Sequence, residues 1–302
     1  MPKESFLLDQ FSALPPREVG LAVLGYPIKH SISPQLHNAA LKVLAEKEPE
    51  FNNWKYHKIE VHPENLSDAL PKLAELGFRG LNLTIPHKVE VLPMLSSMDE
   101  QARAMGAVNT LNWEEGRWKG YNTDGIGLSR SVREVFDRSV KEFQVLVLGA
   151  GGAARAAVAQ CLFEGCENLA IFNRSMERAY QLSSALKENG FEQKISLVKS
   201  LSHFPHNAEQ PVLVINATSL GLAMDDPAPV DLSCLKGEVF VYDMVYNPPD
   251  TRLLMQAKEK RFPHANGLGM LVGQAARSLE IWSEREVSIH AMSCAALQAM
   301  SD

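Results

Sequence analysis

Apolar and polar positions alternate along the first third of the chain in a way that predicts strands and helices in turn. Short apolar runs bounded by glycine or polar residues are typical of buried strands, whereas apolar residues at helical spacing indicate helices. Strands that alternate with helices form a mostly parallel sheet covered on its faces, so this region predicts an α/β domain. We expect strands at Gly20–Gly25, Trp54–Val61 and Gly80–Ile85, and helices at Ser33–Glu46 and Pro63–Leu76.

The pattern changes after residue 106. Two apolar stretches, Ala107–Trp113 and Arg117–Tyr121, flank a Glu114-Glu115-Gly116 turn and predict a β-hairpin. A helix then follows, and a second strand–helix series runs from Phe143 to about Tyr246 before a last helical segment. Glycine-containing segments near Asp124 and Gly267 separate the two patterns. We therefore predict an α/β protein of two domains, residues 1–124 with 267–302 and residues 125–266.

Composition narrows the class of protein. The 302 residues carry a net charge of -6, which does not predict a nucleic-acid partner. No apolar stretch approaches the roughly 18 residues needed to cross a membrane, and the N-terminus has no apolar core typical of a secretory signal. The four cysteines show no disulfide spacing and the nine histidines are scattered, so we expect reduced thiols, no metal site and a cytoplasmic protein. The oligomeric state stays open, with a homodimer as one option.

A glycine-rich turn follows the predicted strand that begins the second domain. The stretch fits the pattern G-x-G-x-x-A, with Gly149 allowing a tight turn and Gly151 allowing the backbone to approach a pyrophosphate. Small Ala154 allows close packing of helix on strand, and the helix N-terminus offers N–H donors to the anion. The strand before and the helix after favour a dinucleotide site over a bare turn. The predicted backbone contacts are Gly149, Ala150, Gly151, Gly152 and Ala153.

The next strand ends in residues that distinguish the two nicotinamide dinucleotides. NAD enzymes commonly carry Asp or Glu there, whereas this chain has Asn173-Arg174-Ser175 and then Arg178. Guanidinium groups without a carboxylate suit a 2′-phosphate, so NADP is the predicted cofactor. The alternative is that both arginines are solvated charges on a helix that Ser175 caps. The phosphate role is favoured for Arg174, and for Arg178 both interpretations stay open.

Polar side chains also mark the end of the third predicted strand. Alternation places Leu81, Leu83 and Ile85 on one face and Asn82 and Thr84 on the other, where a polyhydroxylated ligand would supply partners. Pro86 ends the strand and sets Lys88 in the next turn. Taken alone, Lys88 would be read as a surface lysine.

Two further clusters share this polar character. Ser31 and Ser33 carry hydroxyls two residues apart, and Ser33 suits the N-cap of a helix whose first turn contains Pro34. The hairpin brings Asn109 near the domain junction, alongside Asp124. The stretch from 122 to 125 is also compatible with a plain turn and helix cap.

Together these segments resemble the shikimate dehydrogenase family. The motifs that carry the resemblance lie in order from about residue 20 to 290 and begin with Pro27–Pro34, Asn82–Lys88, Gly106–Thr110 and Asn122–Gly125. They continue with Gly149–Ala153, Asn173–Ser175, Asn216–Ser219, Asp243–Pro248 and Gly267–Gln274.

The resemblance implies a substrate domain, a Rossmann-like NADP domain and an active site between them. The implied activity is the reversible, NADPH-dependent reduction of 3-dehydroshikimate to shikimate, a small-molecule substrate of aromatic amino-acid (chorismate) biosynthesis. Lys88 and Asp124 carry over as the catalytic pair, with Lys88 either donating a proton or acting as an electrostatic clamp. The implied substrate-binding residues are Ser31, Ser33, Asn82, Thr84, Asn109, Tyr246 and Gln274. Thr218, Met244 and Gly267 carry over to the nicotinamide side.

Two alternative functions are compatible with this resemblance. Quinate/shikimate dehydrogenases that use NAD often have a bulkier group in place of the second serine and a different Asn-Arg-Ser tip, and this chain keeps both. A non-catalytic NADP-binding regulatory protein would be indicated by loss of Lys88 or Asp124, and both are present. The chain departs from the family at Arg252, where proline often follows the threonine, and near residues 46–53 and before residue 20.

Overall fold

The computed structural model describes residues 6–7, 14–188, 190–191, 195–205, 207 and 209–301. The chain divides into two compact units. Unit 1 comprises residues 1–123 and 272–302, and unit 2 comprises residues 124–271. The second boundary thus falls inside a helix, a few residues beyond the expected Gly267. Most of the N-terminal stretch judged not to be a secretory signal lies outside the described residues.

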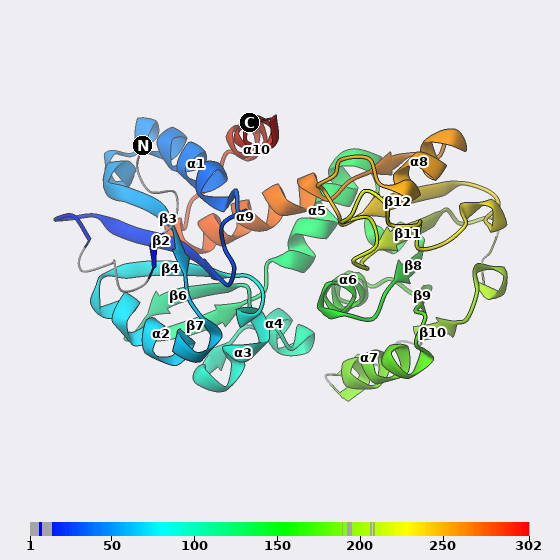
Figure 1. Cartoon of the computed structure of the whole chain (residues 1–302), viewed down its shortest axis with the longest axis horizontal. Helices are drawn as coiled ribbons and strands as arrows, with labels where there is room; N and C mark the ends of the chain where they lie inside the picture. The colour runs from blue at the N-terminus through cyan, green and yellow to red at the C-terminus, as the bar shows by residue number, and fades with distance from the viewer. Residues whose placement is uncertain are drawn as a thin grey trace. The chain divides into compact units, whose positions relative to one another are not determined.

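Unit 1 is built on a sheet that, in the described residues, has seven strands in the order β1-β3-β2-β4-β6-β7-β5 (Figure 1). The first four strands are parallel, as expected, but β6 runs antiparallel to both β4 and β7, so the sheet is mixed. The predicted hairpin is the β6–β7 pair. The strands are β1 Phe6–Leu7, β2 Val19–Gly25, β3 Trp54–Glu60, β4 Phe78–Leu83, β5 Ser97–Met98, β6 Thr110–Glu114 and β7 Arg117–Tyr121.

Helices cover both faces of this sheet. The α-helices are α1 Ser33–Lys47, α2 Leu66–Glu75, α3 His87–Glu90, α4 Glu100–Met105, α9 Leu268–Ser283 and α10 Ile289–Ser301. Short 3-10 turns lie at Pro49–Asn53, Pro63–Asn65 and Leu92–Met94. We expected a helix over residues 63–76. Its first three residues, Pro63–Asn65, instead form a 3-10 turn that leads into α2.

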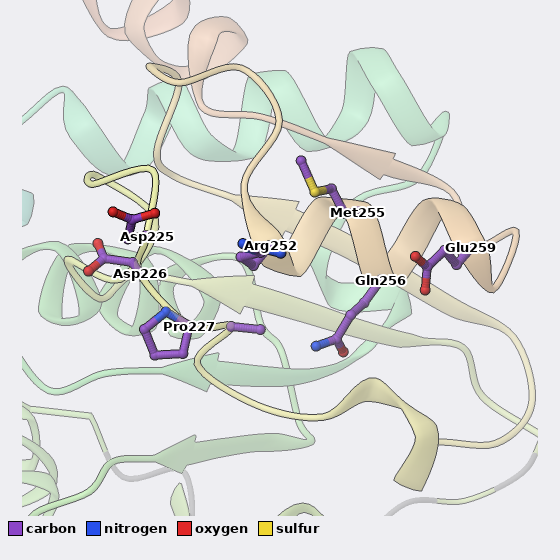
Figure 2. Close-up of a pocket in the computed structure, with 8 residues that line it drawn as sticks. Asp225, Asp226, Pro227, Arg252, Met255, Gln256 and Glu259 are labelled. Carbon is purple, nitrogen blue, oxygen red and sulfur yellow. The ribbon is translucent and has the colours of Figure 1, made fainter.

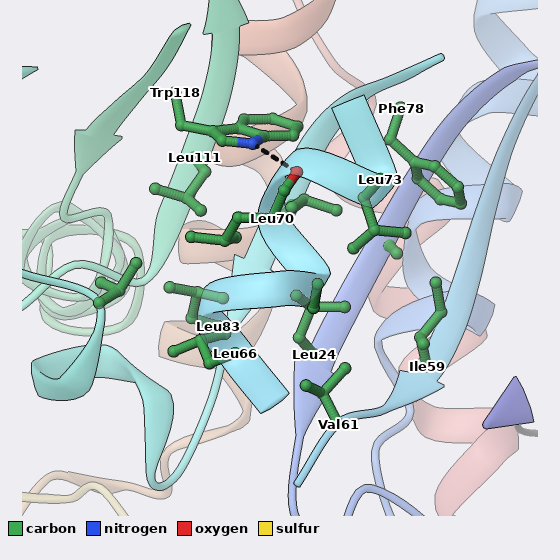
Figure 3. Packing of buried hydrophobic residues seen from close by; sticks show 14 of the residues in the cluster. Leu24, Ile59, Val61, Leu66, Leu70, Leu73, Phe78, Leu83, Leu111 and Trp118 are labelled. Atoms are coloured by element: carbon green, nitrogen blue, oxygen red, sulfur yellow. Dashed lines mark hydrogen bonds between the residues drawn. The ribbon is translucent and has the colours of Figure 1, made fainter. Parts of the chain in front are cut away.

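The amphipathic helix α2 buries its apolar side on one face of the sheet. Leu70 and Leu73 lie in a cluster with Leu24, Leu83 and other buried residues of β2, β3 and β4 (Figure 3). The Trp118 indole N–H donates to the Leu70 carbonyl at 3.0 Å, so the polar group of the largest ring in the cluster is satisfied.

The opposite face of the sheet packs against α1 and α9. Trp282 of α9 is 1% exposed and its indole N–H donates to the Leu111 carbonyl at 2.9 Å. A Cβ on Gly80 of β4 would overlap the Trp282 ring, which explains why a residue without a side chain occupies this place. Asn82, two residues further on, faces the same side. Asn82 therefore points toward α9, where its Nδ2 lies 3.0 Å from the Ser278 hydroxyl, whereas Leu81 and Leu83 point toward α2.

Unit 2 has, in its described residues, a fully parallel sheet in the order β10-β9-β8-β11-β12-β13. Numbered along the chain within the unit, this is the order 3-2-1-4-5-6 of a doubly wound dinucleotide-binding fold. The strands are β8 Gln144–Leu148, β9 Leu169–Phe172, β10 Ile195–Val198, β11 Val212–Asn216, β12 Val239–Asp243 and β13 His264–Ala265. The helices are α5 Asp124–Phe136, α6 Gly152–Phe163, α7 Met176–Glu188 and α8 Arg252–Glu259, with 3-10 turns at Val140–Glu142, Leu201–His203 and Leu232–Cys234.

Two local expectations are wrong. Ser33 is the first residue of α1 and not its N-cap; Ile32 occupies the cap position, and its carbonyl accepts the Gln35 N–H at 3.1 Å. Ile85 is 76% exposed, because β4 ends at Leu83 and the alternation of buried side chains ends with it. Pro34 does lie in the first turn of α1, as predicted.

Candidate functional site

The two serines of the substrate motif lie side by side at the start of α1. Their hydroxyl oxygens are 3.2 Å apart, and Ser31 Oγ also accepts the Ser33 N–H at 3.4 Å. Lys58 of β3 stabilises this turn, because its buried Nζ donates to the carbonyls of Lys29 and Ser31 at 2.9 and 3.1 Å. Lys58 was not predicted as a site residue, since its partners are backbone carbonyls almost thirty residues away.

Asn82 lies at the centre of a buried hydrogen-bond network. Its Oδ1 accepts from the Tyr56 hydroxyl at 2.7 Å, and its Nδ2 lies 3.0 Å from the hydroxyls of Thr110 and Ser278. The same Nδ2 lies 3.1 Å from the Asn109 carbonyl. The sequence suggested that a ligand would supply partners for this amide, but protein groups already supply them. The Asn82 side chain therefore holds the neighbouring residues of the site in place through these hydrogen bonds.

Asn109 and Gln274 join the same network within unit 1. Asn109 Oδ1 accepts the Thr123 N–H at 2.9 Å, and Asn109 Nδ2 lies 3.5 Å from Gln274 Oε1. The Thr123 hydroxyl lies 3.0 Å from Asn109 Nδ2 and 3.2 Å from the Ser278 hydroxyl. Two predicted substrate residues that are far apart in sequence are thus held together. Thr123, Thr110 and Ser278 were not anticipated, because their importance depends on pairing between β4, β6 and α9.

Tyr56 connects this network to the serine turn. Burial raises the pKa of the Tyr56 hydroxyl well above its usual value, and a hydrogen bond with Ser33 opposes that rise. The Tyr56 ring stacks on His37 of α1, with centroids 4.0 Å apart and planes 3° apart. His37 is fully buried, neither of its ring nitrogens has a hydrogen-bond partner in the described part of the chain, and burial lowers its pKa to about 3. A neutral imidazole therefore packs as a flat ring against Tyr56.

We expect Tyr56→Phe to lower the free energy of unfolding by about 1–3 kcal/mol, because Asn82 Oδ1 would be left buried without its donor. Urea unfolding followed by far-UV circular dichroism measures this change. Tyr180→Phe is the matched control, since the Tyr180 side chain is 63% exposed. Equal stability of the Tyr56→Phe variant and the control would show that the hydroxyl contributes nothing.

The two proposed catalytic residues, Lys88 and Asp124, each lie in the first turn of a helix, Lys88 in unit 1 and Asp124 in unit 2. Lys88 lies in α3, the short helix after β4, and is half-buried; its carbonyl accepts the Val108 N–H at 2.8 Å. Thr84, between β4 and α3, is anchored through its N–H to the Leu24 carbonyl at 2.9 Å. Asp124 is the first residue of α5 and follows Thr123, whose backbone is held by Asn109.

The glycine-rich turn joins β8 to α6. Gly149 has φ +114°, and a Cβ there would lie 3.0 Å from the Ala217 carbonyl oxygen, so this position suits glycine alone. Gly151 is the N-cap of α6 and Gly152 its first residue, and the cap makes no side-chain hydrogen bond. A Cβ on either would meet open space within 4 Å. Uncapped N–H groups beside open space fit the pyrophosphate of a dinucleotide. Ala150 precedes these glycines in the turn, and Ala153 is the second residue of α6.

A cavity of about 670 Å³ opens where the ends of β8, β9, β10 and β11 meet in unit 2. Asn173, Arg174 and Thr218 line it, as expected for cofactor contacts. Arg178 is not among the lining residues; its N–H lies 3.4 Å from the Ser175 hydroxyl, which caps α7. Lys199 and Ser219 line the cavity although the sequence did not single them out.

Met244 and Gly267 meet in unit 2. A Cβ on Gly267 would overlap the Met244 carbonyl, and the Gly267 N–H donates to the Val245 carbonyl at 3.1 Å. Asn216 braces the neighbouring turn: its Oδ1 accepts from the Thr218 hydroxyl at 2.8 Å, and its Nδ2 donates to Asp243 at 2.9 Å. Burial raises the pKa of the Asp243 carboxyl and of the nearby Tyr246 hydroxyl.

A second cavity of about 390 Å³ lies between α8 and the loop after β11 (Figure 2). Arg252, Met255, Gln256 and Glu259 of α8 line it together with Asp225, Asp226, Pro227 and Ala228 of the loop. Arg252, one of the positions at which the chain departs from the family pattern, lies here. Three carboxylates against one guanidinium make it a poor site for a phosphate.

Comparison with known proteins assigns the chain to a family. The model of the shikimate dehydrogenase substrate-binding domain matches residues 23–111, and that of shikimate/quinate 5-dehydrogenase matches residues 130–224. The C-terminal domain model of shikimate 5-dehydrogenase matches residues 267–296. The NADP⁺ shikimate dehydrogenase of Citrifermentans bemidjiense is 42% identical over 269 residues, which are 86% of this chain and 88% of that protein. The chain belongs to the shikimate dehydrogenase family.

Solved structures of the family share the fold but differ in ligands. Shikimate 5-dehydrogenase from Thermus thermophilus, in complex with NADP(H) and shikimate, is 32% identical with a TM-score of 0.80, covering 93% of this chain and 99% of that one. Quinate dehydrogenase from Corynebacterium glutamicum, in complex with NAD, is 26% identical with a TM-score of 0.81, covering 93% and 99%. Proteins of this fold are thus found with NADP(H) and shikimate in one case and with NAD in the other. No helix in the described residues has the length and apolar character needed to cross a membrane.

Proposed function

We propose that this protein is an NADP-dependent shikimate dehydrogenase that reversibly reduces 3-dehydroshikimate to shikimate in chorismate biosynthesis. The observation that carries the proposal is the convergence, within unit 1, of the serine turn, Asn82, Asn109 and Gln274 on one hydrogen-bond network. A polyhydroxylated carboxylic acid matches such a wall of hydroxyl and amide groups. The cavity of unit 2, with Arg174 at the tip of β9, matches the phosphorylated ribose of NADP.

The turn after β8 fits the cofactor. The N–H groups at the start of α6 would hold the pyrophosphate, Arg174 the 2′-phosphate, and Thr218, Met244 and Gly267 the nicotinamide side. When bound, NADPH supplies the hydride that reduces the ring ketone.

Ser31 and Ser33 donate hydroxyl hydrogen bonds to the substrate carboxylate, because two hydroxyls 3.2 Å apart match its two oxygens. Thr84, Asn109, Gln274 and Tyr246 bind the carboxylate or the ring hydroxyls, and Asn82 orients this group. Lys88 supplies a proton or a positive charge to the oxygen that gains negative charge during reduction, and Asp124 orients Lys88 and hydrogen-bonds the same hydroxyl.

The direct test of the proposed function is the absorbance of reduced nicotinamide. Purified protein mixed with shikimate and NADP⁺ should form NADPH, and 3-dehydroshikimate with NADPH should reverse the reaction. Absence of turnover in both directions, with both ligands shown to bind, would instead indicate a regulatory binding protein.

We also place the protein in the cytoplasm as a proposal, supported by its four cysteines, none of which forms a disulfide. A homodimer stays a prediction that light scattering after gel filtration would test.

A further inference from the structure

Lys199 stands next to the residues that distinguish NADP from NAD. Strands β9 and β10 are parallel, and Val198 pairs with Phe172 at their carboxyl ends. The residues that follow, Lys199 and Asn173, therefore leave the sheet side by side, with Arg174 next in the chain. Neighbouring parallel strands are about 4.8 Å apart, and Arg174 and Lys199 line the same cavity.

The cavity at these tips has a charge suited to an anion. Arg174 and Lys199 line it together with Asn173, Thr218 and Ser219, and none of its lining residues is a carboxylate. In the described part of the chain no acidic side chain forms an ion pair with Lys199, which is exposed. The cavity beside α8 has the opposite balance, with Asp225, Asp226 and Glu259 around Arg252 (Figure 2). The charge of the first cavity is thus a local property and not a general feature of the unit.

We propose that Lys199 is a specificity-determining residue that binds the 2′-phosphate of NADP together with Arg174. The inference rests on the proposed function and names a residue for its cofactor choice. A 2′-phosphate carries close to two negative charges near neutral pH, so one guanidinium leaves part of that charge unpaired. The planar guanidinium of Arg174 binds the phosphate through two parallel hydrogen bonds, and the flexible side chain of Lys199 adds a single positive charge from the neighbouring strand.

Binding of 2′,5′-ADP and of 5′-AMP to the full-length protein tests this without any need for turnover. The two probes differ in the 2′-phosphate, so the ratio of their dissociation constants isolates the contacts made to that group. We expect Lys199→Ala to weaken 2′,5′-ADP by about three- to tenfold, because solvent screens an exposed ammonium, and to leave 5′-AMP unchanged. Lys199→Arg should restore most of the lost affinity, because it keeps the charge.

Lys187→Ala is the matched control, since this lysine lies at the far end of α7. It should leave both dissociation constants within about 1.5-fold of those of the unaltered protein, a smaller change than the one expected for Lys199→Ala. In steady-state assays, Lys199→Ala should lower the ratio of kcat/KM for NADP⁺ over NAD⁺ by the same factor, with kcat at saturating NADP⁺ retained.

Equal weakening of both probes, or none, would overturn the role of Lys199 while leaving the proposed function intact. If the unaltered protein binds 2′,5′-ADP no more tightly than 5′-AMP, the NADP assignment fails as well, and Lys199 loses its proposed ligand. The two failures are therefore distinguishable in one experiment.

Discussion

Replacing Lys88 by alanine is expected to lower kcat by roughly 10²- to 10⁴-fold, the range that a positioned proton donor or charge contributes. Hydride transfer to a ketone leaves an alkoxide, and this oxygen needs a proton or a close positive charge as it forms. Lys88 sits in α3 directly after the strand that carries Asn82, and its backbone is fixed by the Val108 N–H. The KM for shikimate should change by no more than about threefold, since other residues hold the carboxylate and ring hydroxyls.

Steady-state kinetics with both substrates varied measures this prediction. Lys47→Ala is a suitable control, because Lys47 is the exposed last residue of α1. If Lys88→Ala retains turnover close to that of the control, Lys88 is not catalytic.

Lys88→Arg separates the two roles left open for this side chain. A guanidinium keeps the positive charge but does not lose its proton in a protein. If Lys88 is an electrostatic clamp, the arginine variant should be well above the alanine variant in kcat. If Lys88 donates the proton, both variants should be similarly slow.

The second large effect is expected at the glycine-rich turn. Gly151→Ala should weaken NADPH binding by more than about tenfold, equal to about 1.4 kcal/mol, because a methyl group would occupy the space where the backbone approaches the pyrophosphate. In the protein alone this Cβ meets open space, so the free energy of unfolding should change by less than about 1 kcal/mol. Fluorescence titration with NADPH and thermal unfolding without ligand measure the two quantities.

Gly267→Ala provides the contrasting variant. Its Cβ would overlap the Met244 carbonyl, so the backbone must move, and overpacking of this kind destabilises by about 1–3 kcal/mol. We expect a lower Tm even without cofactor. If Gly151→Ala instead lowers Tm as much as Gly267→Ala, its effect on NADPH arises from misfolding and the assigned role is wrong.

Alternating patterns and turn chemistry predicted most of the fold. The glycine-rich turn, the hairpin and the helices α1, α2 and α5 lie close to where the local sequence placed them, because each depends on neighbours in the chain. The parallel-rich sheet of unit 1 was predicted, but the antiparallel pairing of β6 with β4 was not, since it joins segments that propensity alone does not connect. Ile85 was wrongly placed in the strand, because alternation of apolar and polar residues does not show at which residue a strand ends.

The site was predictable where a motif is continuous and not where partners come from distant segments. Asn82 was found from its strand, but its partners Tyr56 and Ser278 are separated from it by 26 and 196 residues. Lys199 follows a four-residue strand that was not recognised, and only the register of β10 beside β9 places it next to Asn173. Strand order in a doubly wound sheet therefore carries information that single motifs lack.

Initial-rate measurements that cross shikimate with quinate and NADP⁺ with NAD⁺ test both the substrate and the cofactor of this protein in one set. We expect the highest kcat/KM for shikimate with NADP⁺, and a large loss when either partner is exchanged. A higher kcat/KM with quinate or with NAD⁺ would contradict it and would move the protein toward the quinate dehydrogenases of the same fold.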